Sequence, residues 1–480
     1  MGWRQILVYT HRWLGIAGCL LFIAWFTSGI VMMYARMPEL DAQERRSRLP
    51  ILDFAAARVA PGDAFALAAA APQRIRIGMF LGRPVYRALV QGRWTTVFAE
   101  DGRAMKGMTR EDALAVAARF APDQASAIRY DAEIAEPDQW TLQSRALLPM
   151  HRVALGDAAD TVLYVSDRTG EVEVKTTRPE RRVAYFGAVL HWLYFTPLRR
   201  NTAAWTRCII WLSIGGCVVC LSGLVWGFMV ARSSPYAGIM RWHHYAGLIF
   251  GATTFTFLFS GLLSMDPWDW HPGTAPTRLQ RDAATGGPLD LGPLTVDRLR
   301  AGVEMMTRRD AREIDVVQFR GEPFLAAPGM LLAVLHPERG IFPRFGDEVV
   351  EAVARDAMRG VPVVDAIWLR DYDSYYYARS RGDLALPVLR VRFADPQRTW
   401  LYLDPGRGAI VRKEERLSRL NRWLYHGFHS FDFPFLYGRR PLWDIVMLAL
   451  SAGGVASAVT SLVPAWRRVR GKLAGQFTER

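Results

Sequence analysis

Six of the nine histidines in the chain lie at the ends of long apolar segments, where their side chains could bind a metal centre. Histidine is costly in a membrane-spanning helix and tends to mark a functional site there. Two facing neutral imidazoles inside a helical bundle can supply both axial ligands of a haem iron. The six histidines are His11, His191, His243, His244, His426 and His429.

The first group of these histidines lies at the cytoplasmic ends of two predicted transmembrane helices. We expect His11 to face His243 or His244 across the bundle. A flat macrocycle needs space beside its ligands, and glycine side chains leave such space. Four glycines lie within two helical turns of these histidines: Gly15, Gly18, Gly247 and Gly251.

The second group lies on the outer side, just before two further spans. We expect His191 to face His429, with His426, one turn earlier, as a reserve ligand. The pattern also fits other roles. Interfacial histidines and aromatics can anchor a helix in the headgroup region, and buried histidines can bind a metal directly or relay protons.

Four windows in the sequence carry almost no charge and can each cross a membrane. They cover residues 13–34, 208–230, 245–265 and 445–463. About 20 apolar residues suffice to span the hydrocarbon core as a helix. The first window is too long for the apolar core of a typical signal peptide, and no clear cleavage site follows it, so we interpret it as a retained anchor.

Basic residues in the short segments predict the orientation. Arg4, Arg12, Arg232, Arg241 and the arginines after residue 466 place both termini and the middle loop in the cytoplasm. We therefore expect helices in 1–36, 201–231, 243–265 and 441–465, a cytoplasmic loop at 232–242 and a cytoplasmic tail at 466–480. The long segments 37–200 and 266–440 then lie outside. The net charge of +14 is spread over these sites, so we expect no nucleic-acid partner.

The sequence repeats itself at an offset of 232 to 239 residues. His11-x-x-x-Gly15 recurs as His243-x-x-x-Gly247, and Ser28-Gly29 recurs as Ser260-Gly261. Four further residues recur 238 positions later, namely Tyr164, Gly170, His191 and Trp205 as Tyr402, Gly408, His429 and Trp443. The chain therefore reads as two tandem copies of one unit: helix, extracytoplasmic domain, helix.

Some histidines have no counterpart in this repeat. We interpret each of them as a local hydrogen-bonding residue. They are His151, His244, His271 and His336.

The extracytoplasmic segments read as small α+β domains. Residues 85–98 predict strands around a Gln91-Gly92 turn, and Thr109 predicts the start of a helix over 113–120. Residues 161–165 and 399–403 predict further strands. Residues 273–293 are rich in Gly, Pro, Ala and Thr and predict a surface loop.

The motifs resemble those of the PepSY-associated transmembrane helix family, specifically members similar to integral inner-membrane siderophore reductases. The resemblance covers nearly the whole chain. It rests on four stretches, residues 10–15 (THRWLG), 241–247 (RWHHYAG), 259–268 (FSGLLSMDPW) and 422–430 (RWLYHGFHS). The fold expected from it is a bacterial inner-membrane protein of four transmembrane helices in two tandem repeats, each carrying a periplasmic PepSY-like α+β domain.

The resemblance also implies an activity. Family members of this kind hold b-type haem, here expected twice, between histidine pairs and reduce a ferric siderophore in the periplasm. No G-x-G-x-x-G motif follows a predicted strand, and no cytoplasmic stretch can form a nucleotide domain, so no flavin or nicotinamide site is visible. Electrons would then come from quinol in the membrane or from a cytoplasmic protein.

Two other function classes remain open at this stage. The chain could be a transporter or permease accessory, with the histidines relaying protons or binding metal. It could instead be a non-enzymatic regulatory membrane protein whose outer domains bind a partner. No H-E-x-x-H or G-x-S-x-G motif suggests hydrolytic chemistry, and the catalytic residues are unknown.

Overall fold

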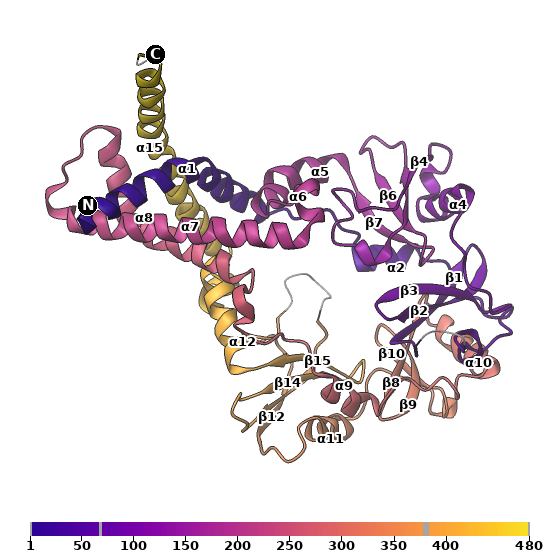
Figure 1. Ribbon diagram of the computed structural model, residues 1–480. Coiled ribbons are helices and arrows are strands. Elements are labelled where there is room, and N and C mark those ends of the chain that lie inside the picture. Colours follow the sequence, from indigo (N-terminus) through magenta and orange to yellow (C-terminus); the bar gives the residue numbers. More distant parts are fainter. Residues whose placement is uncertain (1, 67–69, 378–383, 479–480) are drawn as a thin grey trace. The chain divides into compact units, whose positions relative to one another are not determined.

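The computed structural model describes residues 2–66, 70–377 and 384–478, which form two compact units (Figure 1). We call the first the bundle unit; it contains Met1–Met37, Pro179–Pro272 and Arg419–Arg480. The second is the sheet unit, which contains Pro38–Arg178 and Gly273–Ser418. Each unit therefore combines segments from both halves of the sequence.

Four helices in the bundle unit are long and apolar enough to cross a membrane. They are α1 (Trp3–Met32), α7 (Thr202–Met229), α8 (Ile239–Leu263) and α15 (Leu442–Thr478). Each covers one of the predicted windows to within two residues, so the prediction of four spans agrees with the structure. α1 and α8 each pack against both α7 and α15.

Short helices flank these spans along the chain. Two of them, η3 and η7, are π-helices, whose wider turns are often found at functional sites. The short helices are α5 (Arg178–Ala184), η3 (Tyr185–Val189), α6 (Thr196–Arg200), η4 (Ala231–Ser233), η5 (Pro267–Asp269), α12 (Arg416–Asn421), η7 (Arg422–Gly427), α13 (Phe428–Ser430) and α14 (Pro434–Tyr437).

Three antiparallel sheets form the sheet unit. Their strands are β1 (Arg74–Phe80), β2 (Arg83–Val90), β3 (Arg93–Phe98), β4 (Arg129–Ile134), β5 (Met150–Ala154), β6 (Val162–Ser166), β7 (Val172–Thr176), β8 (Ile314–Phe319), β9 (Glu322–Ala327), β10 (Met330–Ala333), β11 (Ile341–Phe342), β12 (Val363–Leu369), β13 (Val388–Phe393), β14 (Trp400–Asp404) and β15 (Ala409–Glu414). The helices are α2 (Ala42–Arg48), α3 (Pro61–Ala64), α4 (Arg110–Phe120), η1 (Pro122–Gln124), η2 (Arg145–Leu147), α9 (Arg278–Thr285), α10 (Val296–Thr307), η6 (Pro337–Arg339) and α11 (Asp347–Ala357).

One seven-stranded sheet, ordered β11-β10-β9-β8-β1-β2-β3, contains strands from both halves of the sequence. β1 pairs with β8, and Ile75 lies opposite Val316. We expected two separate domains from 37–200 and 266–440, whereas these segments share this sheet and one compact unit. Residues 179–200 and 419–440 instead belong to the bundle unit, because η3 packs against α1 and α13 packs against α8.

The other two sheets have the same strand order, β4-β5-β6-β7 and β12-β13-β14-β15. Their last strand pairs shift register at matching places, after Tyr164 in one sheet and after Tyr402 in the other. Both tyrosines are buried, and each hydroxyl donates to an aspartate, Asp138 at 2.8 Å and Asp373 at 2.9 Å. α4 contributes to the apolar core of the first of these sheets, and α11 and α9 contribute to that of the second.

Several local predictions agree with these elements. The predicted hairpin forms between β2 and β3, and both turn residues, Gln91 and Gly92, have positive φ. Thr109 caps α4, accepting a bond from the Asp112 amide at 3.1 Å. The strands predicted at 161–165 and 399–403 correspond to β6 and β14 within one residue.

The predicted loop at 273–293 was wrong over part of its length, because this segment contains α9. Thr277 accepts a bond from the Gln280 amide at 3.2 Å, and the Gln280 side chain accepts one from the Thr277 amide at 2.8 Å. Gly286, with φ of 80°, ends the helix. The Gly, Pro, Ala and Thr content of the segment favoured a loop. The capping contacts of Thr277 and Gln280 and the left-handed Gly286 outweigh that composition and define a helix.

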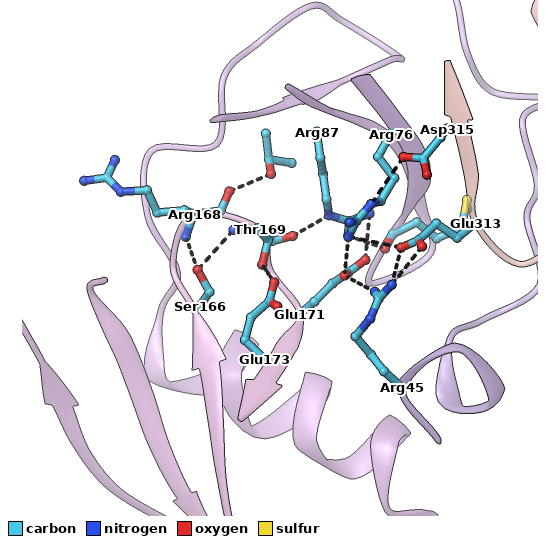
Figure 2. Close-up of polar contacts among 12 residues, drawn as sticks. Arg45, Arg76, Arg87, Ser166, Arg168, Thr169, Glu171, Glu173, Glu313 and Asp315 are labelled. Carbon is cyan, nitrogen blue, oxygen red and sulfur yellow. Dashed lines mark hydrogen bonds and ion pairs between the residues drawn. The ribbon is translucent and has the colours of Figure 1, made fainter. Parts of the chain in front are cut away.

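A buried charge cluster, formed by Arg45, Arg76, Arg87, Glu171 and Glu313, joins α2 to β1, β2 and the segment before β8 (Figure 2). Arg45 bridges the two acids, reaching Glu171 and Glu313 at 2.8 Å each. Burial alone would raise the pKa of Glu313, but the hydrogen bond from Arg45 and the charge of Arg76 lower it overall. The stabilisation from Glu313 is therefore lost as the pH falls through this lowered pKa.

Arg87 is the most deeply placed member of the cluster and is fully buried. Its Nε donates to the carbonyl of Thr169 at 2.6 Å, and its Nη2 donates to the carbonyl of Met79 at 2.9 Å. Its Nη1 lies 3.0 Å from Glu171. Three groups therefore compensate the buried charge of Arg87. Replacing Arg87 is costly, because its carboxylate and carbonyl partners would remain buried without this donor.

We therefore predict that Arg87→Met destabilises the sheet unit by about 3–5 kcal/mol. Hydrogen exchange of the β1 and β2 amides in the full-length protein would measure the loss of protection. Arg74→Met is the matched control, because Arg74 pairs with Asp315 on the same sheet but is about half exposed, and such pairs contribute about 1 kcal/mol or less. Equal protection in the two variants would contradict a structural role for the cluster.

Candidate functional site

The first histidine pair consists of His11 in α1 and His243 in α8. Their ring centres lie 6.1 Å apart, and the ring planes are inclined by 40°. The two rings come from helices on opposite sides of the bundle, since α7 and α15 each pack against both α1 and α8. The prediction that His11 faces His243 or His244 agrees with this geometry, in which the facing residue is His243.

Each ring of the first pair is fixed by a neighbouring helix. Nδ1 of His11 lies 2.9 Å from the carbonyl of Val219 in α7. Nδ1 of His243 lies 3.0 Å from the carbonyl of Ser457 in α15. Because a carbonyl oxygen only accepts, Nδ1 carries the proton in both rings, and Nε2 keeps its lone pair for a metal.

The second histidine pair consists of His191, which follows η3, and His429 in α13. Their ring centres lie 6.0 Å apart, and their planes are inclined by 66°. Each of these histidines follows a π-helix, η3 or η7, at the end of a short helical segment. The second pair is therefore presented by short segments, whereas the first pair lies within two long helices.

The hydrogen bonds of the second pair match each other. Nδ1 of His191 lies 3.1 Å from the carbonyl of Trp25 and 3.2 Å from the Ser28 hydroxyl. Nδ1 of His429 lies 3.2 Å from the carbonyl of Phe257 and 3.0 Å from the Ser260 hydroxyl. Trp25 and Phe257 are 232 positions apart, as are Ser28 and Ser260. Ring orientation is thus fixed in the same way at both positions.

The spacing within each pair fits one metal atom between two imidazoles. Imidazole nitrogens bind first-row metals at about 2.0 Å, so two rings on opposite sides of one metal have centres about 6 Å apart. Both observed separations meet this value. Among the described parts of the chain, no group of three or more His, Cys, Asp or Glu side chains could hold a metal ion. Haem iron needs only two protein ligands.

His244 lies next to His243 but has different partners. Its Nδ1 is 2.9 Å from the Ser234 hydroxyl, and its Nε2 is 3.1 Å from the carbonyl of Gly227. Both ring nitrogens thus connect α8 with the end of α7 and the loop that follows it. Of the two histidines left open by the sequence, His243 faces His11.

His426 belongs to η7, and its ring centre lies 4.2 Å from that of Tyr425. His429 is the histidine that faces His191. The other histidines make local contacts, as predicted. His151 contacts Tyr130, His271 contacts Asp266, and His336 contacts Glu338.

The four glycines expected to leave space divide into two types. A methyl group placed on Gly15 or Gly247 would meet no atom within 4 Å, so both positions are open. Gly18 instead packs against Phe22, and a methyl group on Gly251 would lie 2.8 Å from Leu224. Gly15 and Gly247 therefore leave open space one turn along their helices from His11 and His243, while Gly251 allows close packing of α7 on α8.

Some residues that define the site were not predicted as site residues. Ser28 and Ser260 were noticed only as repeat markers, although each bonds to a histidine of the second pair. Gly223 was missed, and a methyl group there would lie 2.5 Å from Cε1 of His11. The recurring Ser-Gly dipeptide could have indicated the serines, but a single sequence carries no signal for Gly223.

No protein-family model matches the sequence, and no curated protein matches it. The assignment of a role to the two pairs therefore rests on their geometry and on the motifs in the sequence.

We predict that Gly223→Ala displaces the His11 ring, because the added methyl group cannot fit beside it. Overpacking of this kind costs about 1–3 kcal/mol, so the thermal unfolding midpoint of the purified protein should fall. Gly215→Ala is the matched control in α7, since a methyl group there meets no atom within 4 Å. A similar midpoint in the two variants would show that His11 can move without cost.

Proposed function

We propose that this protein is a haem-containing transmembrane electron-transfer protein that reduces a ferric siderophore, or another ferric complex, outside the cytoplasmic membrane. The observation that carries the proposal is the presence, in one helical bundle, of two histidine pairs whose ring centres are close enough to share a metal. One haem b would be held by His11 and His243, and another by His191 and His429.

The positions of the pairs along the helices support a path across the membrane. His11 and Ser28, which bonds to His191, are 17 residues apart in α1, and His243 and Ser260 are 17 residues apart in α8. At 1.5 Å per residue this separation is about 25 Å, close to the thickness of the hydrocarbon core. Each pair therefore serves one side of the bundle.

The chain's own residues define what each site can do. Haem bound between two histidines supplies one-electron chemistry. The carbonyls of Val219, Ser457, Trp25 and Phe257 accept from Nδ1–H and so leave the Nε2 lone pair of each ring available to a metal. Hydrogen bonds of this kind raise the basicity of a ligating imidazole and fix its tautomer. The apolar bundle around them keeps water away and so tunes the potential.

Ferric complexes are a suitable substrate class for such a protein. Siderophores hold Fe(III) through hard oxygen ligands, and one electron converts it to Fe(II), which they hold less tightly. The electron would come from quinol in the membrane or from a cytoplasmic donor protein, which is oxidised in turn. This part of the proposal rests on the resemblance to siderophore reductases of the PepSY-associated family.

The proposed orientation places both termini in the cytoplasm and the sheet unit in the periplasm of a bacterial cell. Basic residues flanking the spans support it. We also propose that the chain arose by tandem duplication of a helix, a PepSY-like domain and a second helix. The two four-stranded sheets of identical order, with matching register shifts after Tyr164 and Tyr402, support that history.

Absorption spectra of the detergent-purified protein, before and after dithionite, test the proposal directly. We expect a Soret shift and a sharp α band on reduction, typical of six-coordinate b haem. His11→Ala and His191→Ala should each lower the haem content from about two to about one per chain, because each removes one of the two histidines that would hold a haem.

Two histidine variants serve as controls for that experiment. His244→Ala removes a buried ring next to His243, and His336→Ala removes an exposed one; both should keep full haem content. A featureless spectrum from cells supplied with haem would overturn the proposal. The histidines would then fit proton transfer or anchoring, and a transporter accessory or regulatory membrane protein would become the better interpretation.

A further inference from the structure

The chain makes the same unusual turn after each histidine of the second pair. Leu193 follows His191 by two residues and has φ of 50°; Phe431 follows His429 by two residues and has φ of 47°. This left-handed conformation is uncommon for residues other than glycine, and it is rarer still for bulky ones. Such strained residues persist only where surrounding contacts hold them, and they gather at functional sites.

A tryptophan from the next spanning helix holds each turn. Nε1 of Trp205, in the first turn of α7, donates to the carbonyl of Trp192 at 2.8 Å. Nε1 of Trp443, at the start of α15, donates to the carbonyl of Ser430 at 2.9 Å. Both carbonyls belong to the residue directly after the histidine. A helix leaves its last carbonyls without internal partners, and these indole N–H groups each satisfy one of them.

The two turns share this bond although their other residues differ. Trp192 and Leu193 in the first turn correspond to Ser430 and Phe431 in the second. The side chains beside the carbonyl therefore change in size and polarity. What stays the same is the histidine, the left-handed residue two positions later, and the indole N–H bonded to the carbonyl between them.

Anchoring in the headgroup region is the ordinary role of tryptophan near a membrane surface. Trp443, however, is only 5% exposed, whereas Trp211 and Trp466, on the same two spanning helices, are 68% and 67% exposed. The rings of Trp205 and Trp443 also pack against Tyr194 and Tyr437. Their placement thus serves contacts inside the bundle unit.

We infer that Trp205 and Trp443 are positioning residues that set the orientation of His191 and His429 through these two bonds. The inference rests on the proposed haem between those histidines. Each short segment carrying a histidine ends in a strained turn, and the hydrogen bond from the indole N–H stabilises that turn. Loss of the bond lets the turn relax and changes the angle between the two imidazole planes, now 66°.

Electron paramagnetic resonance of the oxidised protein tests this inference, because the signal of a low-spin ferric haem depends on the angle between the planes of the two imidazoles that would hold it. The wild type should give two signals, since the pairs are inclined by 40° and 66°. Trp205→Phe and Trp443→Phe keep an aromatic ring but remove the N–H donor. Each should shift the position of the signal from the second pair, or abolish it, and leave the signal from the first pair unchanged.

The first-pair signal also reports whether the bundle remains folded, and Trp211→Phe in α7 is the matched control that should change neither signal. Second-pair signals identical to wild type in both variants would overturn the inference. Equal loss of both signals would also overturn it, because it would indicate a general structural role. A wild type without haem would instead contradict the proposed function, so the two failures are distinguishable.

Discussion

An imidazole N–H inside an apolar helix bundle must find an acceptor, because leaving it unpaired costs about 1–3 kcal/mol. All four paired histidines meet this constraint by bonding through Nδ1 to a main-chain carbonyl of a neighbouring helix. The bond selects the tautomer and limits rotation of the ring. Nε2 of each ring thereby keeps its lone pair, and the ring centres of the two pairs lie 6.1 and 6.0 Å apart.

Bonds between side chains and helix carbonyls also require the helices to lie close together. Gly223 illustrates the requirement, because any larger residue in its place would occupy the volume of the His11 ring. The histidines of the second pair are positioned differently, because they belong to short segments that pack against α1 and α8. Backbone contacts, more than side-chain identity, thus determine where the rings lie. This explains why the carbonyl partners, Trp25 and Phe257, differ in residue type.

The sequence predicted much of this arrangement. Apolar windows long enough to span a membrane identified the four helices, and the 232-residue offset placed the partner of His11 at His243 or its neighbour His244. It could not choose between His243 and His244, because adjacent residues have nearly equal hydropathy and differ only in the direction they face. It also could not predict that β1 pairs with β8, since pairing between strands about 240 residues apart leaves no local pattern. The buried charge cluster was missed for the same reason.

The two pairs differ in the backbone that carries them, and this difference would affect how the redox potential of a haem at each site could be adjusted. His11 and His243 lie within continuous helices, so their ring planes are set by the packing of α1 and α8 against α7 and α15. His191 and His429 lie near the ends of short segments, each followed by a strained residue. Small backbone changes there can rotate a ring without moving a spanning helix. Since ligand orientation and hydrogen bonding influence redox potential, the second of the two proposed haem sites is where the fold would allow adjustment at little cost to the bundle.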